Sequence, residues 1–188
     1  YKSNGGKILD IASNDGTFLN FFDKKKYFRL GIDPAKNLKG LSKKKGIEQL
    51  DNFFTKKESE KLKKEYGDFD IITANHVCAH VENLSDFFSG VQNLLKKDGL
   101  FIFEISYRAS VLKKNTFDTI YHEHLDYHHA NPLIKFLTKI GFSVIDIGVV
   151  NIQGGSLRIL CKKDLKKKIT NKVNKFLKKE EKTNLYNK

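Results

Sequence analysis

The segment of residues 118–127 concentrates side chains that can exchange protons or form hydrogen bonds. It contains imidazoles, phenols and carboxylates within a few positions, including the consecutive Tyr121, His122, Glu123 and His124. Such groups are costly to bury without partners, and an imidazole titrates near neutral pH, where it can take a proton from a substrate. The segment is therefore a candidate catalytic site and not ordinary core.

A second group of polar residues follows the first two predicted strands. The apolar run 7–12 leads into the turn 13–16, and the run that starts at Phe28 ends at Asp33 and Pro34. In a doubly wound sheet, ligands bind beyond the carboxyl ends of the strands, where an acid can bind ribose hydroxyls and small residues expose backbone N–H groups. The pattern indicates a nucleotide or nucleoside site. Since the sequence has neither G-x-G-x-x-G nor a P-loop motif, it favours neither a dinucleotide enzyme nor an NTPase.

Apolar runs and helical patterns alternate along most of the chain, which predicts the elements that position these residues. The predicted strands are residues 7–12, 28–33, 47–54, 69–75, 100–105, 143–150 and 156–161. The predicted helices are residues 17–22, 56–66, 84–95 (ended by Asp98-Gly99), 132–140 and a Lys-rich amphipathic helix over 162–188. Because the last two strands have no helix between them, they form an antiparallel pair. The expected fold is α/β, with a mostly parallel Rossmann-like sheet and an antiparallel final strand.

Composition limits the partners and the compartment. The net charge of +13 comes almost wholly from lysine, whereas nucleic-acid readers rely on the planar fork of arginine, so we expect a Lys-biased surface and no nucleic-acid partner. No apolar run approaches the roughly 20 residues of a membrane helix, and we expect no membrane contact. Cys78 and Cys161 stand far apart in apolar surroundings, which favours free thiols in a reducing cytoplasm.

The first loop resembles the first motif of class I S-adenosylmethionine-dependent methyltransferases, with Ala12 where that motif often has glycine. The resemblance implies S-adenosylmethionine as cofactor, the end of the fourth strand as part of its site, and Phe53 and Asn52 beside the adenine. The residues so assigned to the cofactor are Asp10, Ala12, Ser13, Asn14, Gly16, Asp33, Pro34, Asn52, Phe53, Asn75 and His76.

Three motifs, in residues 75–81, 118–127 and 154–158, look like those of sugar C-methyltransferases that act on nucleotide-linked 4-keto-deoxysugars. The likeness covers residues 7 to about 161. It implies that His124 is the general base at the sugar carbon and that Glu123 assists or orients it. It further implies that Tyr121 and His80 hydrogen-bond the keto oxygen or a sugar hydroxyl. The enolate formed beside the ketone would then take the methyl group.

Other positions in and near these motifs have more than one interpretation. His122, His128 and His129 are expected to be ordinary polar or surface residues. Gly154 and Gly155 fit a tight turn between the last strands as well as a substrate contact. Arg158 fits a phosphate contact as well as an internal ion pair. We assign no metal ligand.

The resemblance also bears on domain organisation. The family normally carries a Cys-rich zinc-binding region before the cofactor domain and another α/β domain after it. We therefore expect residues 1–161 to form the cofactor-binding methyltransferase domain and residues 162–188 to lead toward a C-terminal domain absent from this sequence.

The same residues are compatible with functions other than methylation of a sugar carbon. A metal site could use His122 and His124, which alternate onto one face of an extended segment and have Glu123 nearby. A nucleic-acid methyltransferase would use the lysine excess. An O-methyltransferase would have less need of a strong base over a C–H bond, and a non-catalytic fragment would bind the cofactor alone.

Overall fold

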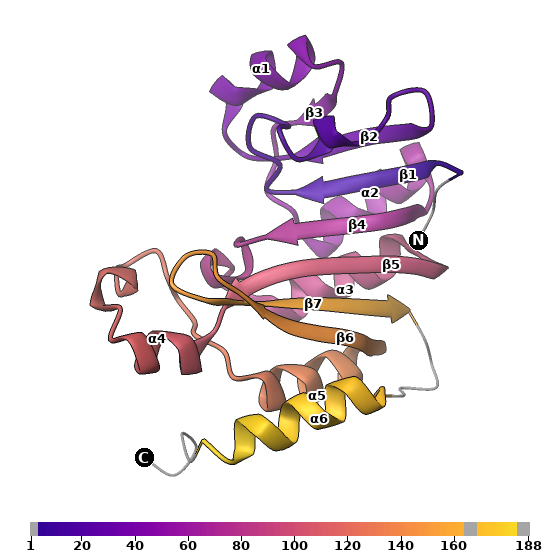
Figure 1. The fold of residues 1–188 in the computed structure, drawn as a ribbon. Coiled ribbons are helices and arrows are strands. Elements are labelled where there is room, and N and C mark those ends of the chain that lie inside the picture. The colour runs from indigo at the N-terminus through magenta and orange to yellow at the C-terminus, as the bar shows by residue number, and fades with distance from the viewer. Residues whose placement is uncertain (1–3, 164–168, 184–188) are drawn as a thin grey trace.

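Strands form one sheet in the computed structural model, which describes residues 4–163 and 169–183. Seven strands among these residues have the order β3-β2-β1-β4-β5-β7-β6 (Figure 1). Their bounds are β1 Gly6–Ile11, β2 Tyr27–Ile32, β3 Glu48–Leu50, β4 Phe69–Asn75, β5 Leu95–Ser106, β6 Phe142–Val150 and β7 Ser156–Lys163. The first five are parallel, whereas β7 is antiparallel to both β5 and β6. This topology confirms the fold class predicted from the sequence.

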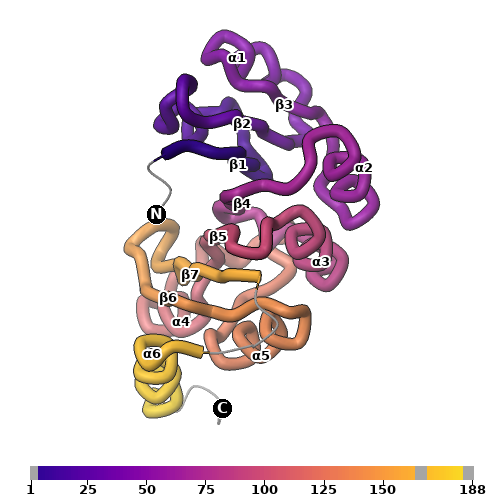
Figure 2. The backbone as a smooth tube through the Cα atoms, turned by 90° about the vertical axis from the view of Figure 1, so that its right-hand side faces the viewer, coloured from indigo at the N-terminus to yellow at the C-terminus, as the bar shows by residue number. Residues whose placement is uncertain are grey.

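Helices α2, α3 and α5 lie together on one side of the sheet (Figure 2). The helices are α1 Lys39–Lys44, α2 Lys56–Tyr66, α3 Leu84–Leu94, α4 Arg108–Lys114, α5 Ala130–Ile140 and α6 Asn171–Glu181. Short 3₁₀ helices are η1 Leu19–Phe21, η2 Lys36–Leu38, η3 Cys78–His80 and η4 Phe117–Thr119. The main core is aromatic: the Phe88 ring of α3 packs edge-on against Phe103 of β5, with centroids 5.3 Å apart. Both cysteines are buried and free.

Two elements, one a charged helix and one a buried apolar strand, have the bounds that the sequence predicted. The bounds of α2 and β4 are those predicted, 56–66 and 69–75. Helix α2 begins at a capping residue, since Thr55 Oγ1 accepts the N–H of Glu58 at 3.1 Å. Strand β4 lies at the centre of the sheet, and its residues are buried through Ala74.

Several predicted boundaries were wrong where side-chain contacts outweigh the apolar pattern. The predicted helix over 17–22 is only the single turn η1, because Asp15 accepts the N–H of Thr17 and holds the chain in a turn. The third strand is limited to β3, and the predicted continuation to residue 54 leaves the sheet. Helix α3 ends at Leu94; Leu95 already pairs with Phe69, so Asp98-Gly99 lies inside β5. Helix α4 was not predicted.

The C-terminal segment differs from the single predicted helix over 162–188. Lys162 and Lys163 continue β7, and only Asn171–Glu181 is helical among the described residues; 164–168 and 184–188 lie outside them. Helix α6 packs against β6 and α5, and its Val173 is part of the main core. No helix in the described part of the chain is both long enough and apolar enough to cross a membrane.

Candidate active site

The predicted site residues come from segments that meet at one edge of the sheet. Strands β1, β2, β4 and β5 are parallel, so their carboxyl ends lie at this edge together with the start of the antiparallel β7. Figure 1 shows the carboxyl ends of β1 and β4 at the left, on the side of α4. The segment 107–129 leaves this edge after β5. The topology therefore gathers both predicted groups of polar residues.

The loop after β1 has an unusual backbone. Ala12 and Asn14 adopt left-handed φ angles of 59° and 52°, a conformation that costs free energy outside glycine and that persists chiefly at functional positions. The left-handed conformation also explains why glycine is frequent at the position of Ala12 in the motif that this loop resembles. The Ala12 N–H donates to Ile32 O at 2.8 Å, which ties the loop to the end of β2.

Asp33 holds this loop in place. Its Oδ2 accepts the N–H of Asn14 and its Oδ1 accepts the N–H of Ala35, both at 2.9 Å. Each oxygen retains a lone pair that a ligand hydroxyl could use. Pro34 is exposed and does not open a helix, because η2 begins at Lys36.

Ser13 presents a buried hydroxyl toward the same loop. Its Oγ has no hydrogen-bond partner among the residues that the structure describes. Gly31 of β2 makes room for it, because a Cβ at Gly31 would lie 2.4 Å from Ser13 Oγ. An orphaned buried hydroxyl beside strained backbone is what a polar ligand such as a nucleoside cofactor would satisfy, so these residues fit the implied cofactor.

Asp10 is placed inside the sheet and not in the loop. It is 3% exposed, and Thr73 Oγ1 donates to its Oδ1 at 2.6 Å. Burial raises the pKa of Asp10 to about 7, against the lowering effect of the Thr73 hydrogen bond, and the charge of Asp33 raises it further. The carboxyl group therefore titrates near neutral pH at the base of the loop.

Phe53 and Asn52 lie beyond β3. Phe53 is 76% exposed and lines a cavity of about 380 Å³ that it shares with His80 and Phe87. The Asn52 amide donates to Glu58 Oε1 at 3.2 Å. The cavity offers an aromatic wall between the ends of β3 and β4, as the predicted contact with adenine requires.

The end of β4 joins a partly buried polar network. His76 follows Asn75 with a left-handed φ of 57°, and its Nε2 lies 3.0 Å from Glu104 Oε2. Arg158 Nε donates to Glu104 Oε1 at 2.6 Å, so Arg158 forms an internal ion pair. Glu104 was not predicted as a site residue, although it is the polar break in the apolar run of β5.

The predicted catalytic residues form a connected cluster. The Tyr121 hydroxyl lies 2.9 Å from His124 Nε2, and His124 Nδ1 lies 2.8 Å from Thr119 O. Because a carbonyl only accepts, the proton of neutral His124 sits on Nδ1 and its lone pair is on Nε2. The rings of His80 and His124 have centroids 5.0 Å apart.

Glu123 enters this cluster through its backbone. His80 Nδ1 lies 2.9 Å from Glu123 O, whereas the Glu123 side chain is 62% exposed and lies 3.9 Å from His122 Nε2. His122 is itself exposed. His129, expected at the surface or in an ordinary polar position, is buried, with Nδ1 3.7 Å from Glu180 Oε1.

A cavity of about 270 Å³ opens beside the cluster, lined by Tyr121, His124 and Gly154 among others. Gly154 and Gly155 have φ angles of 79° and 120°, and a Cβ at Gly155 would lie 2.6 Å from Ser110. The glycines thus form a tight turn, and Gly154 also faces the cavity. Within residues 4–163 and 169–183, no three His, Cys, Asp or Glu side chains are grouped to hold a metal ion.

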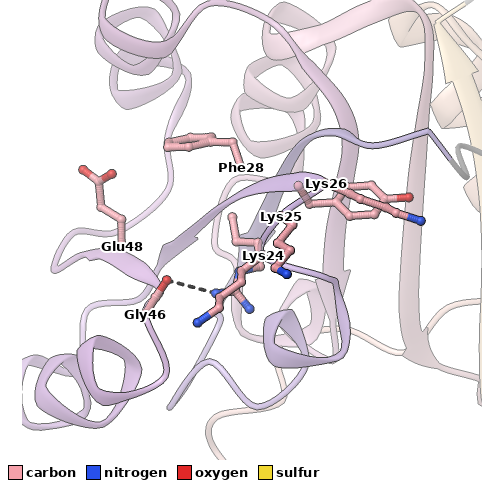
Figure 3. A pocket seen from close by; sticks show the side chains of 8 residues that line it. Lys24, Lys25, Lys26, Phe28, Gly46 and Glu48 are labelled. Carbon is pink, nitrogen blue, oxygen red and sulfur yellow. Dashed lines mark hydrogen bonds between the residues drawn. The ribbon is translucent and has the colours of Figure 1, made fainter.

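A separate hollow lies at the amino ends of β2 and β3. Lys24, Lys25 and Lys26 line it with Glu48, and the dashed line in Figure 3 joins the Arg29 guanidinium to Gly46 O, 3.0 Å apart. Since the amino ends of parallel strands lie opposite their carboxyl ends, this hollow is at the other edge of the sheet from the predicted site.

The strand order and the reversed β7 define a class I, Rossmann-like methyltransferase fold. Comparison with known families agrees with this: residues 1–147 match the methyltransferase domain family, and the chain belongs to it. Membership confirms S-adenosylmethionine as the cofactor predicted from the sequence.

Individual relatives add detail. The chain is 32% identical over 159 residues to the C-methyltransferase NovU of Streptomyces niveus, an alignment that covers 85% of this chain and 38% of NovU. The PH0226 protein of Pyrococcus horikoshii superposes with a TM-score of 0.67 at 18% identity, over 87% of this chain and 84% of that one. Magnesium protoporphyrin IX methyltransferase of Synechocystis, solved with bound SAH, has a TM-score of 0.65 at 16% identity, over 85% and 75% of the two chains. These structural matches show the fold.

Proposed function

We propose that this protein transfers a methyl group from S-adenosylmethionine to a carbon beside the ketone of a nucleotide-linked deoxysugar. The observation that carries the proposal is the His124 imidazole, held by Thr119 O with Nε2 as its basic nitrogen, beside Tyr121 and His80. The identity to a C-methyltransferase supports carbon as the acceptor atom. The sugar nucleotide is the proposed partner, and the two free thiols suit the cytoplasm, where we place the protein.

The loop after β1 holds the cofactor in this proposal. Ser13 Oγ and the free lone pairs of Asp33 supply its polar contacts, and Phe53 lies against the adenine. When bound, S-adenosylmethionine supplies a methyl group on a positively charged sulfur. Asn75 at the end of β4 completes that side of the site.

His124 acts as the general base. Its proton on Nδ1 stays with Thr119 O, so Nε2 is available to receive another. Tyr121 donates its hydroxyl hydrogen to Nε2, and we propose that it relays the proton: the phenol oxygen takes the proton from the sugar carbon as it gives its own to His124. His80 donates its Nδ1 N–H to Glu123 O, so its Nε2 is an acceptor and takes a hydrogen bond from a sugar hydroxyl. Glu123 orients His80 through this backbone contact.

Deuterium exchange tests the proposal. The protein is first titrated with S-adenosylhomocysteine and then incubated in D₂O with a 4-keto-deoxysugar nucleotide, and exchange at the carbon beside the ketone is followed by NMR. We expect His124→Asn to lower exchange by about 10²- to 10⁴-fold without weakening S-adenosylhomocysteine binding. His122→Asn is the matched control, because that imidazole is 90% exposed.

The possible outcomes separate two claims. Exchange that survives His124→Asn would overturn the assigned base. A wild-type protein that binds S-adenosylhomocysteine but neither exchanges nor methylates any 4-keto-deoxysugar nucleotide would overturn the substrate class. Methylation at oxygen without exchange at carbon would favour the O-methyltransferase alternative.

A further inference from the structure

Glu104 of β5 lies between the side chains of Arg158, which is in β7, and of His76, which directly follows β4. Arg158 sits directly opposite it in the antiparallel pair of β5 and β7, and both Nε and Nη2 of Arg158 lie 2.6 Å from Glu104 Oε1. The other oxygen, Oε2, lies 3.0 Å from His76 Nε2. The side chains of Glu104 and His76 are 8% and 17% exposed, whereas that of Arg158 is 48% exposed, so the buried part of this group of three is the pair of Glu104 and His76.

The contacts of Glu104 with Arg158 and His76 determine which nitrogen of His76 carries the proton. Arginine remains charged and only donates, and a carboxylate paired with it only accepts. The contact between Oε2 and Nε2 therefore requires N–H on Nε2. In the neutral imidazole, Nδ1 is then left with a lone pair and acts as a hydrogen-bond acceptor.

This acceptor nitrogen is buried and has no hydrogen-bond partner among the residues that the structure describes. An unsatisfied buried acceptor is a free-energy cost that a ligand can remove. Burial lowers the pKa of His76, against the raising effect of Glu104, and neighbouring His124 and His80 lower it further. His76 is thus held neutral beside the two imidazoles that the proposed reaction uses.

The backbone supports the same arrangement. His76 adopts its left-handed φ immediately after β4, and its N–H donates to Glu104 O at 3.0 Å. Glu104 therefore holds both the backbone and the ring of His76. A side chain fixed at two points and left with one free acceptor is suited to recognise a ligand.

We propose that His76 is a specificity-determining residue whose Nδ1 accepts a hydrogen bond from a hydroxyl group of the sugar that is methylated. Glu104 and Arg158 are positioning residues that keep Nδ1 an acceptor. The inference rests on the proposed function, and it adds a requirement to it: the substrate carries a hydroxyl donor close to the reacting carbon.

Two substitutions at His76 separate its two nitrogens. Asparagine places an amide group near the position of Nδ1 and loses the bond to Glu104, whereas glutamine reaches Glu104 and leaves no group at Nδ1. We expect His76→Gln to raise KM for the hydroxylated sugar nucleotide by about 10- to 100-fold, as for an unpaired buried hydroxyl, with a smaller rise for His76→Asn. A substrate analogue that lacks the hydroxyl should not distinguish wild type from His76→Gln.

A measurement without turnover tests the positioning. In ¹⁵N NMR of the S-adenosylhomocysteine complex at pH 8, His76 should show a protonated Nε2 and a bare Nδ1. Glu104→Gln presents an amide N–H to Nε2 and should move the proton to Nδ1, with a loss of affinity for the hydroxylated substrate similar to that of His76→Gln. Arg158→Lys keeps the charge and should leave the proton on Nε2.

Each result decides the inference. A bare Nε2 in the wild type, or an unchanged KM in His76→Gln while the wild type turns over, overturns it and leaves the proposed function intact. If His76→Gln weakens S-adenosylhomocysteine to the same extent as the sugar, Nδ1 serves the amino group of the cofactor and the inference is also overturned. If His76→Gln does not fold, His76→Asn and the NMR of Glu104→Gln still decide it.

Discussion

The Tyr121 hydroxyl lies 2.9 Å from Nε2 of His124, so the basic nitrogen of the proposed catalytic imidazole already holds a hydrogen bond. Tyr121 is itself 43% exposed, so its phenol is accessible to a ligand. In the proposed reaction, His124 therefore receives the substrate proton through the phenol of Tyr121. The contact therefore makes Tyr121 as important to the proposed reaction as His124.

Substitution of Tyr121 by phenylalanine tests this relay. We expect methyl transfer to fall by about 100-fold or more, because the proton path to His124 is lost, while the affinity for S-adenosylhomocysteine stays unchanged. Tyr127→Phe is the control: its hydroxyl donates to Thr119 O and lies 3.5 Å from His124 Nδ1, so a smaller loss is expected. Steady-state kinetics compare the two. Equal losses would contradict the relay.

Substitution of Asp33 by asparagine tests the cofactor loop. The carboxylate accepts the N–H groups of Asn14 and Ala35 on its two oxygens, and an amide can accept only one of them. We expect the Kd for S-adenosylhomocysteine to rise by about 10- to 100-fold, which corresponds to one unsatisfied buried group. Calorimetric titration measures it. Asp51→Asn, which removes an exposed carboxylate paired with Lys39, should bind as the wild type does.

The raised pKa of Asp10 predicts that the free energy of unfolding falls as the pH rises. Its pKa is about 7 in the folded protein, above the value near 3.9 of an unperturbed aspartate, so the folded state binds more protons between these values. The free energy of unfolding should therefore decrease from about pH 4 to pH 7, by at most about 4 kcal/mol from this group. Asp10→Asn, which cannot ionise, should remove that decrease. Urea unfolding at several pH values measures both proteins, and parallel profiles would contradict the assignment.

The contacts of Glu180 with the start of α5 predict that α6 contributes to the stability of the domain. Its buried carboxylate accepts the N–H of Ala130 at 2.7 Å and that of Asn131 at 3.0 Å, at the start of α5. Glu180→Ala leaves both N–H groups without their acceptor and should lower the free energy of unfolding by about 2–4 kcal/mol. The neighbouring Glu181 is exposed, so Glu181→Ala should have little effect. Thermal unfolding followed by circular dichroism compares them, and equal melting temperatures would show that the cap contributes nothing.

Local sequence patterns were sufficient for the framework of this protein. An apolar run predicted the central strand β4, and a continuous charged stretch predicted the helix α2, whose cap at Thr55 is local. The consecutive strands at the end predicted the antiparallel pair. Polar residues at strand ends predicted that the candidate site residues lie at one edge of the sheet, because parallel strands bring their carboxyl ends together.

The details of the site depend on contacts between residues far apart in the chain. Glu104 and Arg158 are 54 positions apart, and Glu180 lies 50 positions from Ala130. No short-range pattern distinguishes a glutamate that orients a histidine or caps another helix from one on a solvated face. The short turn at Leu19–Phe21 was missed for a related reason: its apolar residues suit a helix, but Asp15 holds the chain otherwise.

The sequence by itself therefore determined the order of the elements, the fold class and which segments carry groups capable of chemistry, since these follow from local periodicity and from residue type. The tertiary structure alone decided how those groups are partnered. It directs the proton of His124 to Thr119 O and its lone pair to Tyr121, and it turns the Glu123 carboxylate away from both. It leaves Nδ1 of His76 as a buried acceptor. Proton positions depend on the nearest donor or acceptor in space, which only the packing of strands and loops brings into contact.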